Sequence, residues 1–325
     1  MTEAAEIERE AAVGDAPFVR PDVAMLLAMM SAAGAPPMNE MAPADAREAY
    51  RMMRFMGDAD PTPLAIIRDL TCPGPKGDIP LRYYDARESR EAGPAIMFFH
   101  GGGFVIGDLE THHPYCTELA AQLDLPVIAV DYRLAPEHPF PAAPEDCEAA
   151  ARWLAENGKQ LGLDITGLVF TGDSAGGNLT IVVTQALVAN PAAVPVIAQA
   201  PLYPVVDSSQ TGGSFTEFAE GYLLTADAMN WFNDNYAATP GDVRNDCILG
   251  DLATLPPTLL VTAGLDPLRD QGRDFAARCV KAGVDVTYME MRGTIHGFIC
   301  LRKGIPSAQA DCDAIFRGMK AMLSL

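Results

Sequence analysis

The chain has little positive charge and no apolar stretch long enough to cross a membrane. Its 325 residues include 23 Lys and Arg against 43 Asp and Glu, a formal net charge of -20. Nucleic acids and anionic membranes are bound by concentrated positive charge, so we expect neither as a partner. No run of about 18 apolar residues occurs, and the N-terminus lacks the basic and apolar regions of a secretion signal. These features predict a cytoplasmic protein.

Patterns for cysteine pairing and for nucleotide binding are also missing. The seven cysteines are odd in number, scattered and without Cys-x-x-Cys spacing, which favours reduced, buried thiols over a disulfide framework or a zinc site. No glycine cluster gives Gly-x-Gly-x-x-Gly with a following ribose-binding acid, and none is followed by Gly-Lys-Ser/Thr. We therefore expect no metal, nucleotide or other cofactor.

From about residue 61 onward, short apolar runs alternate with helix-length segments. The apolar runs are 95–99, 127–130, 168–170, 196–198, 259–262 and 286–289. The segments between them that can form helices are 111–123, 142–160, 175–189 and 267–282. Continuous apolar strands separated by helices predict an α/β fold with a mostly parallel central sheet and helices on both faces. Residues 71–84 predict an antiparallel edge hairpin.

Two segments fall outside this alternation and predict a helical cap. Residues 1–60 are rich in Ala, Met, Glu and Pro, with helices expected over 21–30 and 43–56. Residues 205–246 hold a polar loop and then an aromatic helix over 225–236, and such an insertion should lie over the strand ends where ligands bind. The expected division is a cap from 1–60 and 205–246, and a catalytic domain from 61–204 and 247–325.

A serine between glycines follows the apolar run 168–170. The sequence Gly-Asp-Ser-Ala-Gly occupies 172–176 and leads into the expected helix 175–189. The glycines permit a tight turn, and Ser174 would stand at the positive end of the helix, where developing negative charge is stabilised. The pattern alone is weak, and an ordinary glycine-rich turn is the alternative.

A serine nucleophile needs a base, and the base needs an orienting acid. His296 stands in a glycine-flanked loop after the last expected strand, although a surface-loop histidine is the alternative. Asp266 directly follows the run 259–262, although an aspartate before proline also suits a helix cap. Asp270 is a second carboxylate nearby, but Asp266 stands at the end of the strand. The order Ser174, Asp266, His296 is that of α/β-hydrolases.

Three successive glycines, residues 101–103, follow the run 95–99. Their amides are suited to converge on a tetrahedral oxygen, together with the amide of Ala175 after the serine. A flexible linker is the alternative, but a linker does not normally stand between a buried strand and an apolar segment such as 104–106.

Together these segments resemble the bacterial hormone-sensitive-lipase-like esterases of the α/β-hydrolase fold. The resemblance covers roughly residues 70–325. It rests on His-Gly-Gly-Gly at 100–103, Asp-Tyr-Arg-Leu-Ala-Pro-Glu-His-Pro-Phe-Pro-Ala at 131–142, Gly-Asp-Ser-Ala-Gly-Gly-Asn at 172–178, Asp-Pro-Leu-Arg-Asp at 266–270 and His-Gly-Phe at 296–298. The pentapeptide Gly-Asp-Ser-Ala-Gly is similar to that of the family branch named for it.

The resemblance implies a serine esterase with Ser174 as nucleophile, His296 as base and Asp266 as orienting acid. Its substrate would be a small-molecule ester with a short to medium acyl group, hydrolysed through an acyl-enzyme without a metal or organic cofactor. Hydrolysis of amides, carbamates or lactones by the same triad is one alternative, and ligand binding without chemistry is another. A homodimer formed through the edge of the last strand is common in that family.

The resemblance also implies how the triad is surrounded. The oxyanion hole would be formed by the amides of Gly102, Gly103 and Ala175. His100 would hold the glycine loop, and Arg133 and Glu137 would form an ion pair that braces it. Substrate size should depend on the cap, where the candidates for an acyl pocket are Met29, Phe215, Tyr222, Leu223 and Trp231, although each could equally join the cap to the main domain.

Overall fold

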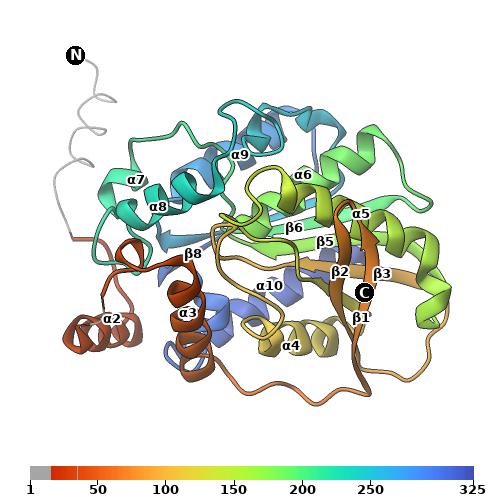
Figure 1. The fold of residues 1–325 in the computed structure, drawn as a ribbon, viewed down its shortest axis with the longest axis horizontal. Helices are drawn as coiled ribbons and strands as arrows, with labels where there is room; N and C mark the ends of the chain where they lie inside the picture. The colour runs from red at the N-terminus through yellow and green to blue at the C-terminus, as the bar shows by residue number, and fades with distance from the viewer. Residues whose placement is uncertain (1–15, 35) are drawn as a thin grey trace.

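The computed structural model describes residues 16–34 and 36–325, and within these ranges the chain forms an eight-stranded central sheet (Figure 1). The strand order is β1-β2-β4-β3-β5-β6-β7-β8. β2 runs antiparallel to its neighbours β1 and β4, and every other adjacent pair is parallel. The mostly parallel sheet expected from the sequence is confirmed.

The strands form where the apolar runs predict them. Their bounds are β1 (Ile66–Gly74), β2 (Gly77–Asp85), β3 (Gly93–Phe99), β4 (Val127–Val130), β5 (Ile165–Asp173), β6 (Val196–Leu202), β7 (Thr258–Leu265) and β8 (Val286–Ile295). β4 and β7 are buried along their whole length because helices cover both faces of the sheet. The hairpin expected over 71–84 is present as β1 and β2 at one edge.

Helices cover the sheet in two groups (Figure 1). One face carries α4 (His113–Leu123) and α10 (Ala308–Leu323), and the other carries α5 (Ala142–Asn157), α6 (Ala175–Ala189) and α9 (Arg269–Lys281). Leu119 of α4 and Ile315 of α10 share a buried cluster with Phe98. Leu179 of α6 shares a second cluster with Phe170. α10 is not among the helices that the sequence pattern predicts.

The two segments outside the alternation are also helical. The first contains α2 (Pro21–Ala33), the 3-10 turn η1 (Met38–Glu40) and α3 (Pro43–Gly57), and residues 1–15 of the expected cap lie outside the described residues. The second contains α7 (Ser214–Glu217) and α8 (Ala226–Tyr236). Four further 3-10 turns are η2 (Gly158–Leu161), η3 (Cys247–Leu249), η4 (Leu252–Thr254) and η5 (Phe298–Cys300). Within the described ranges, no helix combines the length and apolar character needed to cross a membrane.

The register of the sheet brings the predicted site segments together. Phe99 pairs with Gly172 in the parallel register of β3 and β5, so the glycine loop after β3 starts beside the turn that holds Ser174. Leu265 pairs with Ile295 between β7 and β8, so Asp266 and His296 follow directly from neighbouring strand ends. All of these residues stand at the carboxyl edge of the sheet, where such folds place ligand sites.

Candidate active site

Ser174 occupies a sharp turn between β5 and α6. Its backbone has φ 56° and ψ -117°, a conformation that residues with a side chain rarely adopt. A Cβ at Gly172 would lie 2.3 Å from the carbonyl oxygen of Phe99, and a Cβ at Gly176 would lie 1.9 Å from the same oxygen. The close approach of β3 therefore requires glycine on both sides of the serine.

The side chains of His296 and Asp266 continue from Ser174 in a hydrogen-bonded series. His296 Nε2 lies 2.8 Å from Ser174 Oγ, and His296 Nδ1 lies 2.7 Å from Asp266 Oδ2. Asp266 is wholly buried, and its Oδ1 accepts a hydrogen bond from the Leu268 amide at 2.8 Å. One oxygen of Asp266 therefore orients the imidazole while the other holds the turn into α9. The helix-cap alternative is wrong, because Leu268 and not Asp266 is the N-cap residue of α9.

Asp270, the second carboxylate of this segment, has different contacts. It accepts a hydrogen bond from the Ser214 amide at 2.8 Å and forms ion pairs with Arg269 and Arg273. Asp270 therefore joins α7 to α9, whereas Asp266 is the carboxylate that contacts His296.

The glycine loop after β3 lies beside Ser174. Gly102 and Gly103 have φ angles of 121° and 58°, and a Cβ on Gly102 would lie 2.2 Å from the carbonyl oxygen of Ile106. Among the described residues, the amides of Gly102, Gly103 and Ala175 donate no hydrogen bond to a protein acceptor. All three residues line the same cavity as Ser174. Free backbone donors next to a serine hydroxyl can receive an oxygen that develops negative charge.

Asp173 anchors this loop next to the serine. Its Oδ1 accepts a hydrogen bond from the Gly101 amide at 2.8 Å and lies 3.1 Å from Nε2 of His112. Burial alone would raise the pKa of Asp173, but the charge and contact of His112, the charge of Arg54 and the Gly101 amide bring that pKa to about 2. The carboxylate is therefore ionised at neutral pH and fixed against the start of the loop.

His100 is buried below the same loop. Its Nδ1 lies 2.8 Å from the carbonyl oxygen of Gly101, and its ring stacks on Tyr132 with 4.2 Å between ring centroids. Burial, followed by the neighbouring His112, lowers the pKa of His100 to about 4, so the ring is neutral at pH 7. These contacts fit the bracing role that the family resemblance implies.

The expected ion pair between Arg133 and Glu137 is wrong. Arg133 contacts Asp146 of α5 instead, with Nε at 2.8 Å and Nη2 at 2.7 Å from its two carboxylate oxygens. Glu137 pairs with Arg47 of α3, whose hydrogen bonds bring the pKa of Glu137 down to about 2. Both true partners lie outside the motif, and Arg47 is 90 residues away along the chain, so the motif alone could not reveal them.

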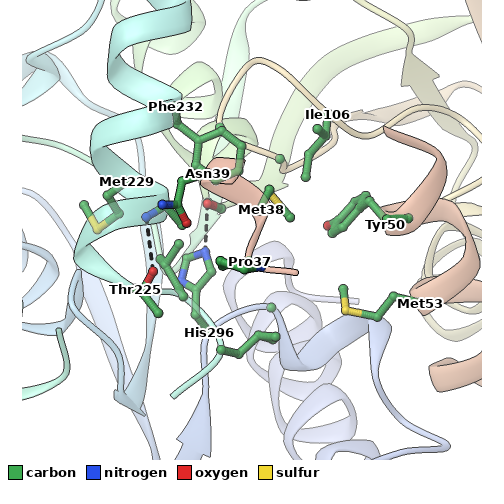
Figure 2. A pocket seen from close by; sticks show the side chains of 18 of the residues that line it. Pro37, Met38, Asn39, Tyr50, Met53, Ile106, Thr225, Met229, Phe232 and His296 are labelled. Carbon is green, nitrogen blue, oxygen red and sulfur yellow. Dashed lines mark hydrogen bonds between the residues drawn. The ribbon is translucent and has the colours of Figure 1, made fainter. Parts of the chain in front are cut away.

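A cavity of about 590 Å³ opens beside Ser174 and His296. The N-terminal segment lines it with Met38 and Met53, and α8 lines it from the other side with Met229 and Phe232, as Figure 2 shows. Met30, Met41 and Met56 also line it. Methionines adapt their shape easily, so this lining suits apolar groups of varied form.

Of the five side chains expected in the acyl pocket, Leu223 lines this cavity and Met29, Phe215, Tyr222 and Trp231 do not. Met29 is 63% exposed on α2. Tyr222 packs edge-on against Phe218, and Trp231 packs edge-on against Phe232. Both aromatic pairs lie within the insertion, but Tyr222 and Trp231 also pack against the buried clusters of the main domain, which is the alternative that the sequence left open for these two.

The lining residues that sequence reasoning missed come mainly from η1 and α3. The buried positions of α3 are Ala46, Tyr50 and Arg54, spaced four residues apart, so this helix turns one side inward. That spacing could have indicated α3 as a helix beside the cavity in addition to α2, which contributes Met30.

The fold and this geometry are those of an α/β-hydrolase. Residues 96–300 match the family model described as alpha/beta hydrolase fold. Esterase LipI of Mycobacterium tuberculosis is 38% identical over 268 residues, which are 78% of this chain and 80% of that protein. Ethyl acetate hydrolase of Pseudomonas putida is 35% identical over 306 residues, which are 90% of this chain and 95% of that protein.

A solved structure gives the same result. An ester-hydrolase from the metagenome of Lake Arreo matches with a TM-score of 0.90 and 38% identity, covering 95% of this chain and 100% of that one. The chain belongs to the α/β-hydrolase family, among its hormone-sensitive-lipase-like esterases. The fold class and the family expected from the sequence are confirmed.

Proposed function

We propose that the protein is a serine ester hydrolase that cleaves esters of short to medium acyl groups through an acyl-enzyme. The observation that carries this proposal is the series of hydrogen bonds from Ser174 through His296 to Asp266 at the edge of an apolar cavity. The family and its esterase relatives support it.

In the first half of the reaction, Ser174 Oγ attacks the ester carbonyl carbon while His296 Nε2 takes the hydroxyl proton. Asp266 accepts the hydrogen bond from His296 Nδ1–H, so Nε2 faces the serine without a proton, and it stabilises the imidazolium that forms. The carbonyl oxygen becomes an oxyanion. Its hydrogen-bond donors are the amides of Gly102, Gly103 and Ala175, and one such donor is typically worth about 3 kcal/mol.

Collapse of the tetrahedral intermediate breaks the bond to the alcohol oxygen, and His296 gives its proton to that leaving group. A water molecule then gives a proton to His296 while its oxygen attacks the acyl carbon. The second collapse breaks the bond to Ser174 Oγ, which takes the proton back, and the carboxylic acid leaves. One ester and one water become one acid and one alcohol.

The proposal includes a cap formed by the described parts of residues 1–60 and 205–246. Its support is the lining of the cavity, which takes Met38 and Met53 from the first segment and Met229 and Phe232 from the second. A volume of about 590 Å³ is in the range of small-molecule sites. The acyl preference is tested with a series of aryl esters from acetate to palmitate, and a maximum at palmitate would contradict the short to medium assignment.

The central test is replacement of Ser174 by alanine. We expect turnover of an aryl acetate to fall by several orders of magnitude while the far-ultraviolet circular dichroism stays unchanged. A phosphonate ester should add its mass to the wild-type protein and not to the Ser174→Ala variant. Near-normal turnover in the variant would overturn the nucleophile assignment. Absence of both turnover and labelling in the wild type would favour ligand binding, and faster cleavage of matched amides would favour an amide hydrolase.

A further inference from the structure

Helix α3 contacts both of the loops that border Ser174. Arg47 Nε donates a hydrogen bond to the carbonyl oxygen of Val105, at 2.8 Å, in the loop that follows β3. Arg54 Nη1 donates to the carbonyl oxygen of Gly297, at 2.9 Å, directly after His296. The two arginines are about two helical turns apart, so they extend from the same side of α3.

The contact of Arg47 acts on the backbone of the glycine loop itself. The Val105 amide donates to the carbonyl oxygen of Gly102 at 3.1 Å, so Val105 is bonded both to Arg47 and to the loop. Arg47 Nη2 also donates to the carbonyl oxygen of Ala135 at 2.8 Å. The guanidinium therefore holds two backbone segments at once.

The contact of Arg54 is unusual for a buried cation. Arg54 is 5% exposed, and within the described residues it forms no ion pair with a carboxylate. Its hydrogen-bond partners are the carbonyl oxygen of Gly297 and the hydroxyl of Tyr50, and its guanidinium carbon lies 4.5 Å from the centre of the Tyr50 ring. Burying a cation without a paired carboxylate is costly. The charge of Arg54 lowers the pKa of the buried Asp173 carboxyl, but Arg54 does not contact that carboxylate directly, and its hydrogen bond to Gly297 makes it a fixed donor to the loop of His296.

The end of α3 is fixed to the chain that follows His296. The amides of Lys303 and Gly304 both donate to the carbonyl oxygen of Gly57, each at 2.9 Å. Asp58 forms an ion pair with Arg302, with 2.8 Å between Oδ1 and Nε, and both side chains are buried. α3 cannot move relative to this part of the chain without breaking buried contacts.

We propose that α3 is a brace that sets the glycine loop and the His296 loop at the correct separation, with Arg47 and Arg54 as its positioning residues. The proposal rests on the proposed ester hydrolysis. Ser174 and the Ala175 amide are fixed by the turn after β5, but the other two oxyanion donors and the base come from two separate loops that must both meet one reacting carbon. A misplacement of about 1 Å at such a site can lower the rate about a hundredfold.

The test is a double-mutant cycle with Arg47→Met, Arg54→Met and the double variant. kcat and KM are measured on an aryl acetate, per active site titrated to completion with a phosphonate. We expect each single variant to lower kcat by roughly ten- to a hundredfold and to change KM by less than about threefold, because alignment is lost and binding is kept. We expect the double variant to match the slower single variant within about threefold, since either loss already frees the two loops from each other.

Two further variants complete the design. Arg54→Lys keeps the charge and one donor, so we expect it to recover part of kcat, and it carries the test if Arg54→Met does not fold. Arg278→Met is the matched control, because Arg278 is a helical arginine that pairs with Asp274 inside α9, and we expect wild-type kcat.

The outcomes are distinct. If the losses in the double variant multiply, the two arginines act independently and the brace is wrong. If kcat per titrated site stays unchanged while Tm falls, both arginines have only a structural role, and this result would also overturn the brace proposal. Failure of the proposed ester hydrolysis has a different signature, since the wild-type protein itself would then neither react with the phosphonate nor hydrolyse the ester.

Discussion

Replacing Asp266 by asparagine would separate the two contacts of this buried carboxylate. Oδ1 accepts from the Leu268 amide at 2.8 Å, and Oδ2 lies 2.7 Å from His296 Nδ1. An asparagine side chain has one accepting oxygen and one donating NH2 group, so it can accept from only one of these two donors. The activity of the variant therefore depends on which of the two donors, the Leu268 amide or His296 Nδ1–H, the asparagine oxygen accepts from.

We expect the asparagine oxygen to accept from the Leu268 amide. This amide cannot give up its proton, and turning the NH2 group toward it would leave a buried donor unpaired, at a cost of about 1–3 kcal/mol. The imidazole of His296 can adapt, because its proton can move from Nδ1 to Nε2. The asparagine oxygen therefore stays on Leu268 and the NH2 group faces Nδ1. Nε2 then presents a proton to Ser174 and cannot act as base. We expect kcat to fall by about 10⁴-fold, as a wrong tautomer does in serine-protease triads.

The assay measures the rate at which nitrophenol is released from its acetate ester at neutral pH, expressed per mole of folded protein. Tm is measured on the same samples. Asp270→Asn is the matched control, because Asp270 contacts Ser214 and Arg269 rather than His296, and we expect its kcat within about threefold of wild type. An Asp266→Asn variant that keeps more than about a tenth of kcat would refute the tautomer argument. A large loss in Asp270→Asn alone would move the acid role to Asp270.

Two further predictions follow from local geometry and charge. Gly176→Ala places a Cβ 1.9 Å from the carbonyl oxygen of Phe99, a backbone atom, so we expect a loss of more than about 4 kcal/mol of unfolding free energy, and an unchanged Tm would contradict this. Burial lowers the pKa of His100 to about 4, so its contribution to stability is present above about pH 6.5 and is lost as the pH falls toward 4. Burial, then the charge of Asp108, raises the pKa of Asp131 to about 6, so its contribution is present below about pH 4 and is lost as the pH rises through 6. Each contribution to the free energy of unfolding is about 3 kcal/mol, and the two change in opposite directions over this pH range, so they largely cancel in the wild type. In Asp131→Asn only the loss from His100 remains, so we expect its stability to urea to fall between about pH 6.5 and 4.

The strands, the main helices and the order of the site segments could be predicted because their signals are local. A run such as 127–130 is apolar throughout, and it forms β4 with those bounds. The helix after Ser174 has the expected bounds 175–189, since glycine punctuation and apolar spacing agree there. Once the strands are parallel, their carboxyl ends must share one edge, so the residues after β3, β5, β7 and β8 had to approach one another.

The partners of charged side chains and the faces of the cap helices could not be predicted in this way. Arg133 and Glu137 occupy one motif, yet each pairs with a residue from a different helix, Asp146 and Arg47. α2 is apolar on most sides, so its sequence does not tell which methionines face the cavity, and Met29 faces solvent. The expected homodimer stays a prediction, which sedimentation of the purified protein would test.

The contacts of α3 bear on how a substrate could enter. Composition groups α3 with α2 in one cap, but its arginines are joined to the backbone on both sides of Ser174. If α3 moved at each turnover, the buried hydrogen bond between Arg54 and Gly297 would break, and Arg54 would keep only Tyr50, a residue of α3 itself, as a hydrogen-bond partner. Such a cost is consistent with α3 as a fixed brace and argues against α3 as a moving lid. We therefore expect entry to depend on the other segments that line the cavity, η1 and α8, so that α3 belongs with the sheet as part of the fixed framework.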